Sequence, residues 1–215
     1  MNNKLKTYAM TLMLGMGLVG VSAPAQAGDA ISFFADIGAQ SQYIWRGAAQ
    51  SVNNDVAIQG DVGIEHESGV SANVWFSTGV DVGTGKETEY DITIDYSGEA
   101  GDIGYSVGYI AYKYTDTSLE FNEIYGGVSF DIASLTAYYD SDNKNLYTEL
   151  GVGTTIADMF DASFAFGVNS PDVGSSTNHI TLGASKDFDN INVNATIGKA
   201  GSANAEFAAG VNYAF

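Results

Sequence analysis

Acidic side chains recur at alternate positions along several stretches of the chain, and they carry most of its potential chemistry. Residues two apart point to the same face of a β-strand, so such a row sets its carboxylates side by side. A passage lined by Asp and Glu favours cations over anions. Arg46 is the one clear base that we assign to this face. The acids assigned to it are Asp36, Asp61, Glu65, Glu89, Asp91, Asp95, Glu123, Asp131, Asp140, Glu149 and Glu206.

Large aromatic side chains share the acidic face. They are Trp75, Tyr112, Tyr114, Tyr125, Tyr138 and Tyr147. Aromatic faces attract ammonium groups through cation–π interactions, whereas aromatics set opposite glycines are common structural filler. Two interpretations therefore stay open. The face lines a passage with an aromatic wall, or the aromatics plug the interior while the carboxylates bond to one another and to water.

Enzymatic chemistry has little support in the sequence. The chain has two histidines and no cysteine, which excludes thiol catalysis, Cys-ligated zinc and iron–sulfur clusters. His179, with Ser175, Ser176 and Asp172 nearby, is the one place where a hydrolase at the rim of a barrel could be built. No Gly-x-Ser-x-Gly motif includes Ser175 or Ser176. We therefore expect no enzyme, no cofactor and no metal.

The overall composition is strongly acidic. Among 215 residues, 8 Lys and Arg face 26 Asp and Glu, giving a formal net charge of −18. This balance excludes a nucleic-acid binder, which needs a basic surface to displace counterions from phosphates. Intrinsic disorder fits poorly, because 45% of the residues are hydrophobic and 12% are aromatic. A chain rich in Gly and Tyr and poor in Pro points to many short strands.

The N-terminus resembles an export signal. Lys4 and Lys6 precede an uncharged, mostly apolar stretch over residues 8–22, and Ala25-Gln26-Ala27 provides a small-x-small cleavage pattern. We predict a signal peptide over residues 1–27 and a single mature domain over residues 28–215. A retained membrane anchor is the alternative, but the apolar stretch is shorter than the roughly 20 residues that span a bilayer.

The elements that must position the acids are β-strands. Apolar and polar residues alternate with a period of two almost throughout the mature chain, and no helical stripe competes with this pattern. Near residues 121–124 the phase slips by one, which predicts a β-bulge. The twelve predicted strands cover residues 31–46, 55–65, 70–80, 88–97, 103–114, 120–131, 134–141, 146–156, 161–169, 178–187, 190–199 and 205–215.

The connections between these strands alternate between short turns and mostly longer loops, as in a transmembrane up-and-down barrel. The apolar face is almost free of charge across its middle. The main charged residue on this face is Lys113, which lies near a strand end. A soluble β-sandwich is the alternative. The apolar face also carries aromatics toward the strand ends, as the girdles of a membrane barrel do, namely Tyr43, Trp45, Tyr90, Tyr96, Phe130 and Tyr139.

The chain ends on an alternating strand that closes with Phe215, like bacterial outer-membrane proteins. We therefore predict an all-β fold, a transmembrane antiparallel barrel of about twelve strands in the cell outer membrane. Its expected partners are outer-membrane lipid, small hydrophilic solutes and, through the last strand, the barrel assembly machinery. A homo-oligomer is compatible with the sequence.

Several short motifs also resemble one family. They are Tyr43-Ile44-Trp45-Arg46-Gly47, Gln50-Ser51, His66-Glu67-Ser68-Gly69, Trp75-x-Ser77 and Asn122-Glu123-Ile124-Tyr125-Gly126. Their order resembles the TorF family of outer-membrane porins over roughly residues 30–130. The resemblance implies an outer-membrane barrel and a link to trimethylamine N-oxide respiration, and it supplies no substrate. The motif residues Tyr43, Arg46, Gln50, His66 and Trp75 then either face solute or are turn and girdle residues that build the barrel.

These patterns predict passive diffusion of small hydrophilic solutes through an acidic lumen that prefers cations and zwitterions over anions. A closed barrel that acts through its loops, as a structural or adhesive element, is the second hypothesis. A rim hydrolase is the third. Strand number alone does not decide between an open and a filled lumen, because twelve lies between filled eight-stranded barrels and open barrels of sixteen or more strands.

Overall fold

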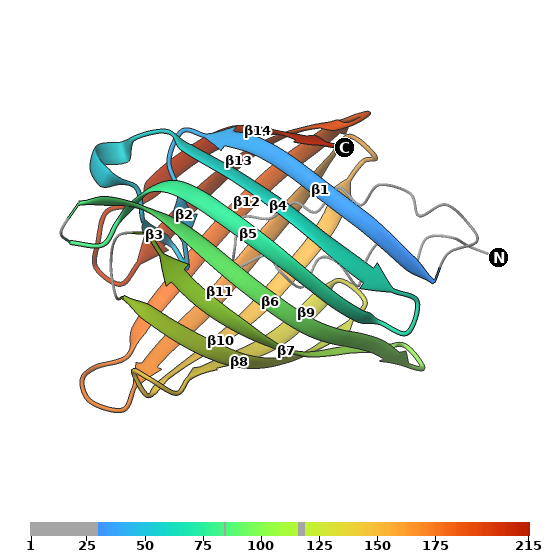
Figure 1. Cartoon of the computed structure of the whole chain (residues 1–215), viewed down its shortest axis with the longest axis horizontal. Coiled ribbons are helices and arrows are strands. Elements are labelled where there is room, and N and C mark those ends of the chain that lie inside the picture. Colours follow the sequence, from blue (N-terminus) through green and yellow to red (C-terminus); the bar gives the residue numbers. More distant parts are fainter. Residues whose placement is uncertain (1–29, 84, 116–118) are drawn as a thin grey trace.

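The computed structural model describes residues 30–83, 85–115 and 119–215, which form a closed antiparallel barrel of twelve strands (Figure 1). The predicted signal peptide over residues 1–27 lies outside the described residues. Within the described part of the chain, no helix is long and apolar enough to cross a bilayer. The barrel strands are β1 (Ile31–Gln40), β4 (Ala57–His66), β5 (Val70–Asp81), β6 (Lys86–Ala100), β7 (Ile103–Tyr114), β8 (Glu120–Phe130), β9 (Ala133–Asp140), β10 (Asn145–Ile156), β11 (Phe160–Pro171), β12 (Thr177–Phe188), β13 (Ile191–Ala200) and β14 (Glu206–Ala214).

Each strand pairs with its neighbour in sequence, and the ring closes where β1 pairs with β14. At this seam Asp36 lies opposite Ala214, and the Phe215 amide donates a hydrogen bond of 3.0 Å to the Ala35 carbonyl. Closure leaves no unpaired sheet edge, which a barrel surrounded by lipid requires. The prediction of a twelve-stranded barrel is confirmed.

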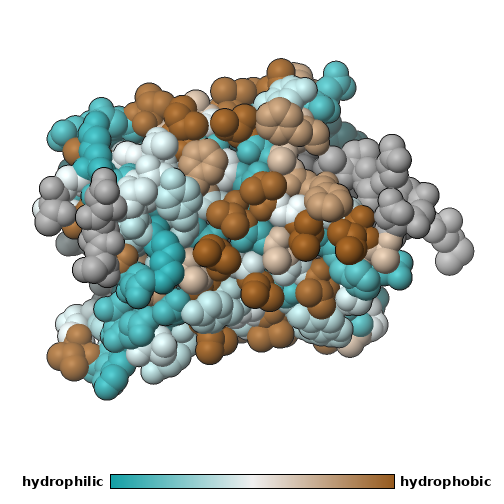
Figure 2. Space-filling view, viewed as in Figure 1, coloured by the Kyte–Doolittle hydropathy of each residue, from teal (hydrophilic) through white to brown (hydrophobic). Residues whose placement is uncertain are grey.

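The outer surface of the barrel is apolar. Phe33 is 77% exposed and Phe130 is 62% exposed, whereas alternate residues of the same strands face the interior. Figure 2 shows these hydrophobic side chains gathered over the middle of the barrel wall, with hydrophilic residues concentrated at one end. Water would make such a surface unfavourable, so lipid is its natural environment. Of the predicted girdle residues, Tyr90, Tyr96, Phe130 and Tyr139 do point outward.

The two ends of the barrel differ. Tight turns join the strands at one end, which we call the turn end, and mostly longer connections follow β1, β5, β7, β9, β11 and β13 at the other, the loop end. Lys113 lies near the loop end, where its exposed ammonium group pairs with the Glu120 carboxylate. A cation at this height reaches the polar boundary of a bilayer.

The bulge predicted near residues 121–124 is wrong. The pairing of β7 with β8 is continuous there, and the register shift falls instead between Ser77 and Val80 on β5. Phe121 is an inward residue whose ring stacks on Tyr112 with the centroids 4.2 Å apart. The apparent phase slip arose because an apolar residue sits on the polar face, where another aromatic ring covers it.

The first predicted strand, residues 31–46, is too long. The wall strand β1 ends at Gln40, and the chain then leaves the wall to form β2 (Ile44–Trp45), β3 (Ala48–Ala49) and the short 3-10 turn η2 (Val52–Asn54) before β4. Tyr43 and Trp45 therefore do not belong to an outer girdle. Tyr43 is 3% exposed, and Trp45 packs against the buried interior clusters.

Candidate functional site

Residues 41–51 form a hairpin that folds into the barrel, which we call the inward hairpin. Its strands β2 and β3 pair Ile44 with Ala49, and the Gln50 amide donates to the Tyr43 carbonyl at 2.8 Å. The two residues at its tip, Arg46 and Gly47, have φ angles of 46° and 75°. Positive φ at both central positions is the requirement of a type I′ hairpin turn. Glycine accepts this conformation freely, but for arginine it is strained.

Wall strands hold both ends of the inward hairpin. The Ser41 amide donates to the Ala209 carbonyl at 2.8 Å, and Gln42 Nε2 donates to the Phe207 carbonyl at 2.7 Å. At the other end, Ser51 forms a β-bridge with Val80. The hairpin is therefore anchored to β14 at its start and to β5 at its end, and it cannot swing out without breaking these contacts.

The tip of the hairpin packs directly on the wall. A Cβ atom at Gly47 would lie 2.6 Å from the Lys199 carbonyl oxygen, and one at Gly198 would lie 2.7 Å from Ile44 Cγ2. Such distances leave no room for side chains, so two glycines allow the hairpin backbone to lie against β13. The Arg46 carbonyl also contacts His179 Nδ1 on β12.

From this tip the Arg46 side chain crosses the lumen to Glu123. The two groups form a bidentate ion pair, with Nη1–Oε1 at 2.8 Å and Nη2–Oε2 at 2.7 Å, and their side chains are 6% and 2% exposed. In the ring of twelve strands, β8 lies five places from β13, on which the hairpin tip packs, so the pair reaches from one side of the lumen to the far wall. We call the Arg46–Glu123 pair the latch.

Aromatic rings surround the latch. The guanidinium carbon of Arg46 lies 4.1 Å from the Tyr147 ring centre, 4.3 Å from Trp45 and 4.9 Å from Tyr138. Burial by itself would lower the pKa of Arg46, but the Glu123 carboxylate more than offsets this and raises the pKa above its usual value. The latch is therefore charged, and desolvation makes its attraction stronger than that of an exposed pair.

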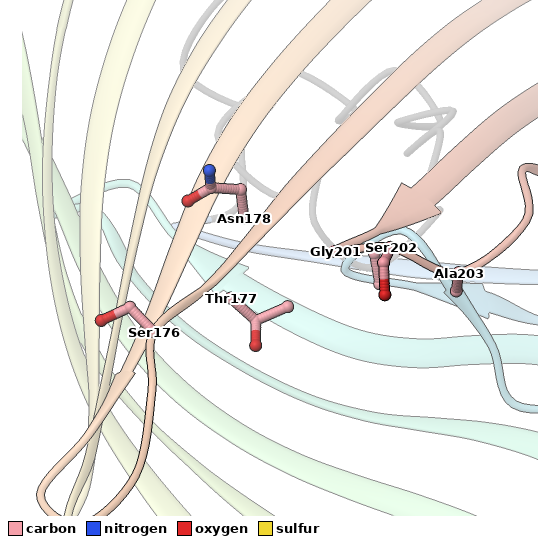
Figure 3. A pocket seen from close by; sticks show the side chains of 7 residues that line it. Ser176, Thr177, Asn178, Gly201, Ser202 and Ala203 are labelled. Atoms are coloured by element: carbon pink, nitrogen blue, oxygen red, sulfur yellow. The ribbon is translucent and has the colours of Figure 1, made fainter.

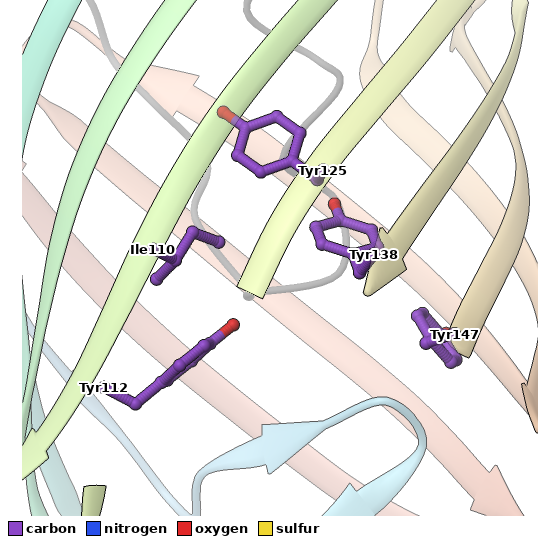
Figure 4. Packing of buried hydrophobic residues seen from close by; sticks show 5 residues of the cluster. All are labelled: Ile110, Tyr112, Tyr125, Tyr138 and Tyr147. Atoms are coloured by element: carbon purple, nitrogen blue, oxygen red, sulfur yellow. The ribbon is translucent and has the colours of Figure 1, made fainter. Parts of the chain in front are cut away.

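Tyrosine hydroxyls hold several of the predicted lumen acids. Tyr114 donates to Glu89 and Tyr147 donates to Glu149, each at 2.6 Å, Tyr112 donates to Glu123 at 2.8 Å, and Tyr125 donates to Asp95. Figure 4 shows Tyr112, Tyr125, Tyr138 and Tyr147 as a layer on adjoining strands. The sequence placed both residue types on the inward face correctly, but it gave no sign of this pairing.

Other predicted acids lie nearer the turn end. Asp36 and Asp61 face each other across β1 and β4, both half-buried, and Asn73 donates to Asp61 at 3.0 and 3.2 Å. Glu65 is exposed, close to the turn after β4. Together they extend the acidic face from the inward hairpin toward the turn end.

Two of the predicted acids lie at the loop end and accept hydrogen bonds there. Asp140 accepts hydrogen bonds from the Asp142 and Asn143 amides at 2.9 and 3.0 Å, so it shapes the turn after β9. Glu206 accepts a 3.4 Å bond from Gln42 of the inward hairpin. The assignment of Asp131 to the lumen is wrong. It occupies an exposed turn with a φ of 52°, where a short polar residue is favoured.

The proposed hydrolase constellation does not form. His179 Nδ1 contacts the Arg46 carbonyl and its ring packs on Tyr147, whereas Ser176 bonds to the Ser170 hydroxyl at 3.4 Å. Beside these residues the loop end has an open depression of about 560 Å³ (Figure 3). Its lining is small or neutral and provides no general base, namely Ser176, Thr177, Asn178, Ala200, Gly201, Ser202 and Ala203.

Sequence reasoning missed the inward hairpin, although its residues were singled out as a motif. Arg46 is the only lysine or arginine among the described inward side chains, and one such cation among many carboxylates needs an acidic partner. The pair Arg46-Gly47 between two short apolar runs is also a weak hairpin signal. Neither feature specifies Glu123, which lies 77 residues further along the chain.

The closed antiparallel barrel, its apolar outer belt and its polar interior define an outer-membrane β-barrel protein. The fold is that of a KdgM porin, with a TM-score of 0.63 and 12% identity over 85% of this chain and 99% of that one. A KdgM porin in complex with disordered oligogalacturonate gives a TM-score of 0.60 at 11% identity, with the same coverage.

The chain belongs to the family described as "Bacterial protein of unknown function (Gcw_chp)", whose model matches residues 24–213. This description differs from the TorF name that the motifs suggested. No curated protein matches the chain.

Proposed function

We propose that this barrel is an outer-membrane channel for small hydrophilic solutes and that it prefers cations and zwitterions over anions. One observation carries the proposal. Carboxylates face the interior from Glu65 near the turn end, through Asp36 and Asp61, to Glu89 near the loop end. The base that enters this interior, Arg46, is paired with an acid. The wall therefore keeps a net negative charge along its height.

The inward hairpin sets the narrowest part of this channel. It reaches across the lumen, and the latch ties it to the far wall. Solutes then pass beside the hairpin and meet no unpaired arginine. In a confined space with low-dielectric walls, carboxylates act strongly on a passing charge, so they favour cations.

The same charge argues against acidic oligosaccharides as solutes. Oligogalacturonate, which accompanies one KdgM porin of similar fold, is a polyanion. In this chain the described inward side chains include many acids and a single lysine or arginine, so a polyanion would meet repulsion along the whole passage. Shared fold therefore does not imply shared solute. The link to trimethylamine N-oxide respiration stays a prediction from the TorF resemblance.

A closed barrel is the second candidate, and the latch is the observation that favours it. The Arg46 guanidinium, the three aromatic rings around it and Glu123 fill part of the lumen near the loop end. Tyr43 also packs on Trp75, with the ring centres 5.3 Å apart. If this layer stays shut, the protein acts through its loops or as a structural element of the membrane.

Solute entry into proteoliposomes separates the two candidates. We expect liposomes that contain the purified barrel to admit a small cationic or zwitterionic solute faster than an anionic solute of equal size. Exclusion of all three by a correctly folded barrel would favour the closed form. Faster entry of the anion would overturn the charge argument while leaving the channel in place.

A further inference from the structure

One histidine contacts the tip of the inward hairpin. His179, the third residue of β12, lies at the loop end, and its Nδ1 atom meets the Arg46 carbonyl oxygen. A carbonyl oxygen can only accept a hydrogen bond, so we assign the ring proton to Nδ1 and leave Nε2 bare. The Nε2 atom is buried and has no hydrogen-bond partner among the described residues. The seated hairpin therefore matches the neutral form of His179.

A second proton on this ring has an unfavourable position. It would turn Nε2 into a buried N–H donor without an acceptor, and the ring into a cation. The Tyr147 ring contacts both His179 and Arg46, since its centre lies 5.5 Å from the His179 ring centre and 4.1 Å from the guanidinium carbon. Two cations that share one buried aromatic ring repel each other, because little water screens them. Protonation of His179 therefore disfavours the seated hairpin.

The carboxylates of the described residues around His179 are engaged while the hairpin is seated. The groups that face the histidine from neighbouring elements are Gly167 on β11, Ala200 on β13, Tyr147 on β10 and Arg46 on the hairpin. Glu149 accepts the Tyr147 hydroxyl, and Glu123 holds Arg46. When the tip leaves, its guanidinium leaves with it, and both acids lose a nearby cation that an imidazolium can replace. His179 therefore binds a proton more tightly when the hairpin is displaced.

The contact lies at the strained point of the hairpin. Arg46 holds a φ of 46°, which is unfavourable for a residue with a side chain. His179 meets the backbone of that same residue, so a change in its charge acts directly on the turn. The tip thus combines a strained turn with a titratable group.

We propose that His179 is a proton sensor for the inward hairpin, so that acid displaces the hairpin and widens the channel. The inference rests on the proposed function, because it concerns the regulation of the same lumen. A proton that binds more tightly to the displaced state shifts the equilibrium toward that state as the pH falls. Imidazole ordinarily titrates at about pH 6.5, above the range of most carboxyl groups. The longer loops of outer-membrane barrels face the exterior, so His179 responds to external pH.

Thiol labelling at two pH values tests the sensor without requiring transport. Ser51→Cys places a thiol at a buried position of the inward hairpin, in a chain that has no cysteine. Each labelling rate is divided by that of the same thiol in the unfolded chain at the same pH, which removes the titration of the thiol itself. We expect the normalised rate of the folded mature barrel to rise about tenfold from about pH 7.5 to about pH 5.5, the effect of a one-unit difference in proton affinity between the two states.

Two histidine variants in this background identify the group that titrates. His179→Asn keeps an N–H donor near the position of Nδ1 but takes up no proton in this range, so its rate should be equal at the two pH values. His66→Asn is the matched control. It removes the other histidine, whose Nδ1 bonds to the Ser68 hydroxyl at 2.8 Å at the turn end, and it should keep the full response. Titration of the lumen carboxyl groups is common to all these barrels and cancels in the comparison.

Circular dichroism confirms folding, and His179→Gln replaces His179→Asn if that variant does not fold. If Ser51→Cys does not fold, acrylamide quenching of Trp45, which packs on both interior clusters, reports the hairpin in a Trp75→Phe barrel. Equal rates at the two pH values, or a rise that persists in the folded His179 variant, would overturn the sensor. An acid-dependent rate without conductance would keep the sensor and reject the channel, and conductance with a rate independent of pH would do the reverse.

Discussion

Replacing Arg46 by alanine should release the inward hairpin. The change leaves Glu123 buried with only the Tyr112 hydroxyl as a partner and removes three ring contacts at 4.1–4.9 Å. Removing one member of a buried ion pair typically costs about 3–5 kcal/mol. The backbone hydrogen bonds between the wall strands stay intact. Most of the lost free energy therefore destabilises the seated position of the hairpin relative to a displaced one. The ratio of displaced to seated hairpin should then rise by a factor on the order of 10² to 10³.

Thiol labelling measures this displacement directly. The native chain has no cysteine, so Ser51→Cys provides a single thiol at a position of the inward hairpin that is buried while the hairpin is seated. When the hairpin closes faster than a maleimide reacts, the labelling rate follows the displaced population. We expect Arg46→Ala to raise this rate about a hundredfold and to increase single-channel conductance.

Lys113→Ala is the matched control for the latch. It breaks an ion pair with Glu120 whose side chains are 44% and 59% exposed, and such pairs contribute only about 0–1 kcal/mol. Its labelling rate should stay within a few-fold of the parent rate. Equal rates in the two variants would show that Arg46 does not seat the hairpin.

Three further changes test other parts of the account. Gly198→Val should overpack against Ile44, destabilise the seated hairpin by about 1–3 kcal/mol and raise thiol labelling, whereas Gly126→Val, whose Cβ would meet only the Ser106 carbonyl oxygen at 3.8 Å, should not. Replacing Asp36 and Asp61 together by asparagine should lower the cation-to-anion permeability ratio, measured from reversal potentials, without loss of folded barrel. Phe215→Ala should reduce the heat-modifiable folded form in outer membranes, and an unchanged amount would argue against a role of this residue in assembly.

The barrel wall could be predicted from the sequence because its two faces meet different environments. Strict alternation in stretches such as residues 88–97 fixes which side chains face lipid, and strand pairing between neighbours follows from short turns. For this reason Glu89, Asp91 and Trp75 were placed on the inward face correctly, and the outward position of Tyr90 followed from the same pattern.

Alternation does not reveal where a chain leaves the wall. Tyr43 and Trp45 continue the phase of β1, yet the chain turns inward at Ser41, and the same residues become part of the lumen. The latch depends on residues 77 positions apart whose approach is set by barrel closure. Asp131 was misplaced for a related reason, since a turn residue at the end of a strand still fits the strand's period.

The reversal potential of the wild-type barrel under a tenfold potassium chloride gradient is the most direct test of the acidic channel. The account predicts measurable conductance and a reversal potential displaced toward the potassium equilibrium potential, because inward carboxylates outnumber the one arginine among the described lumen residues, which is itself paired with Glu123. A displacement toward the chloride equilibrium potential, or a folded barrel that does not conduct at all, would contradict it.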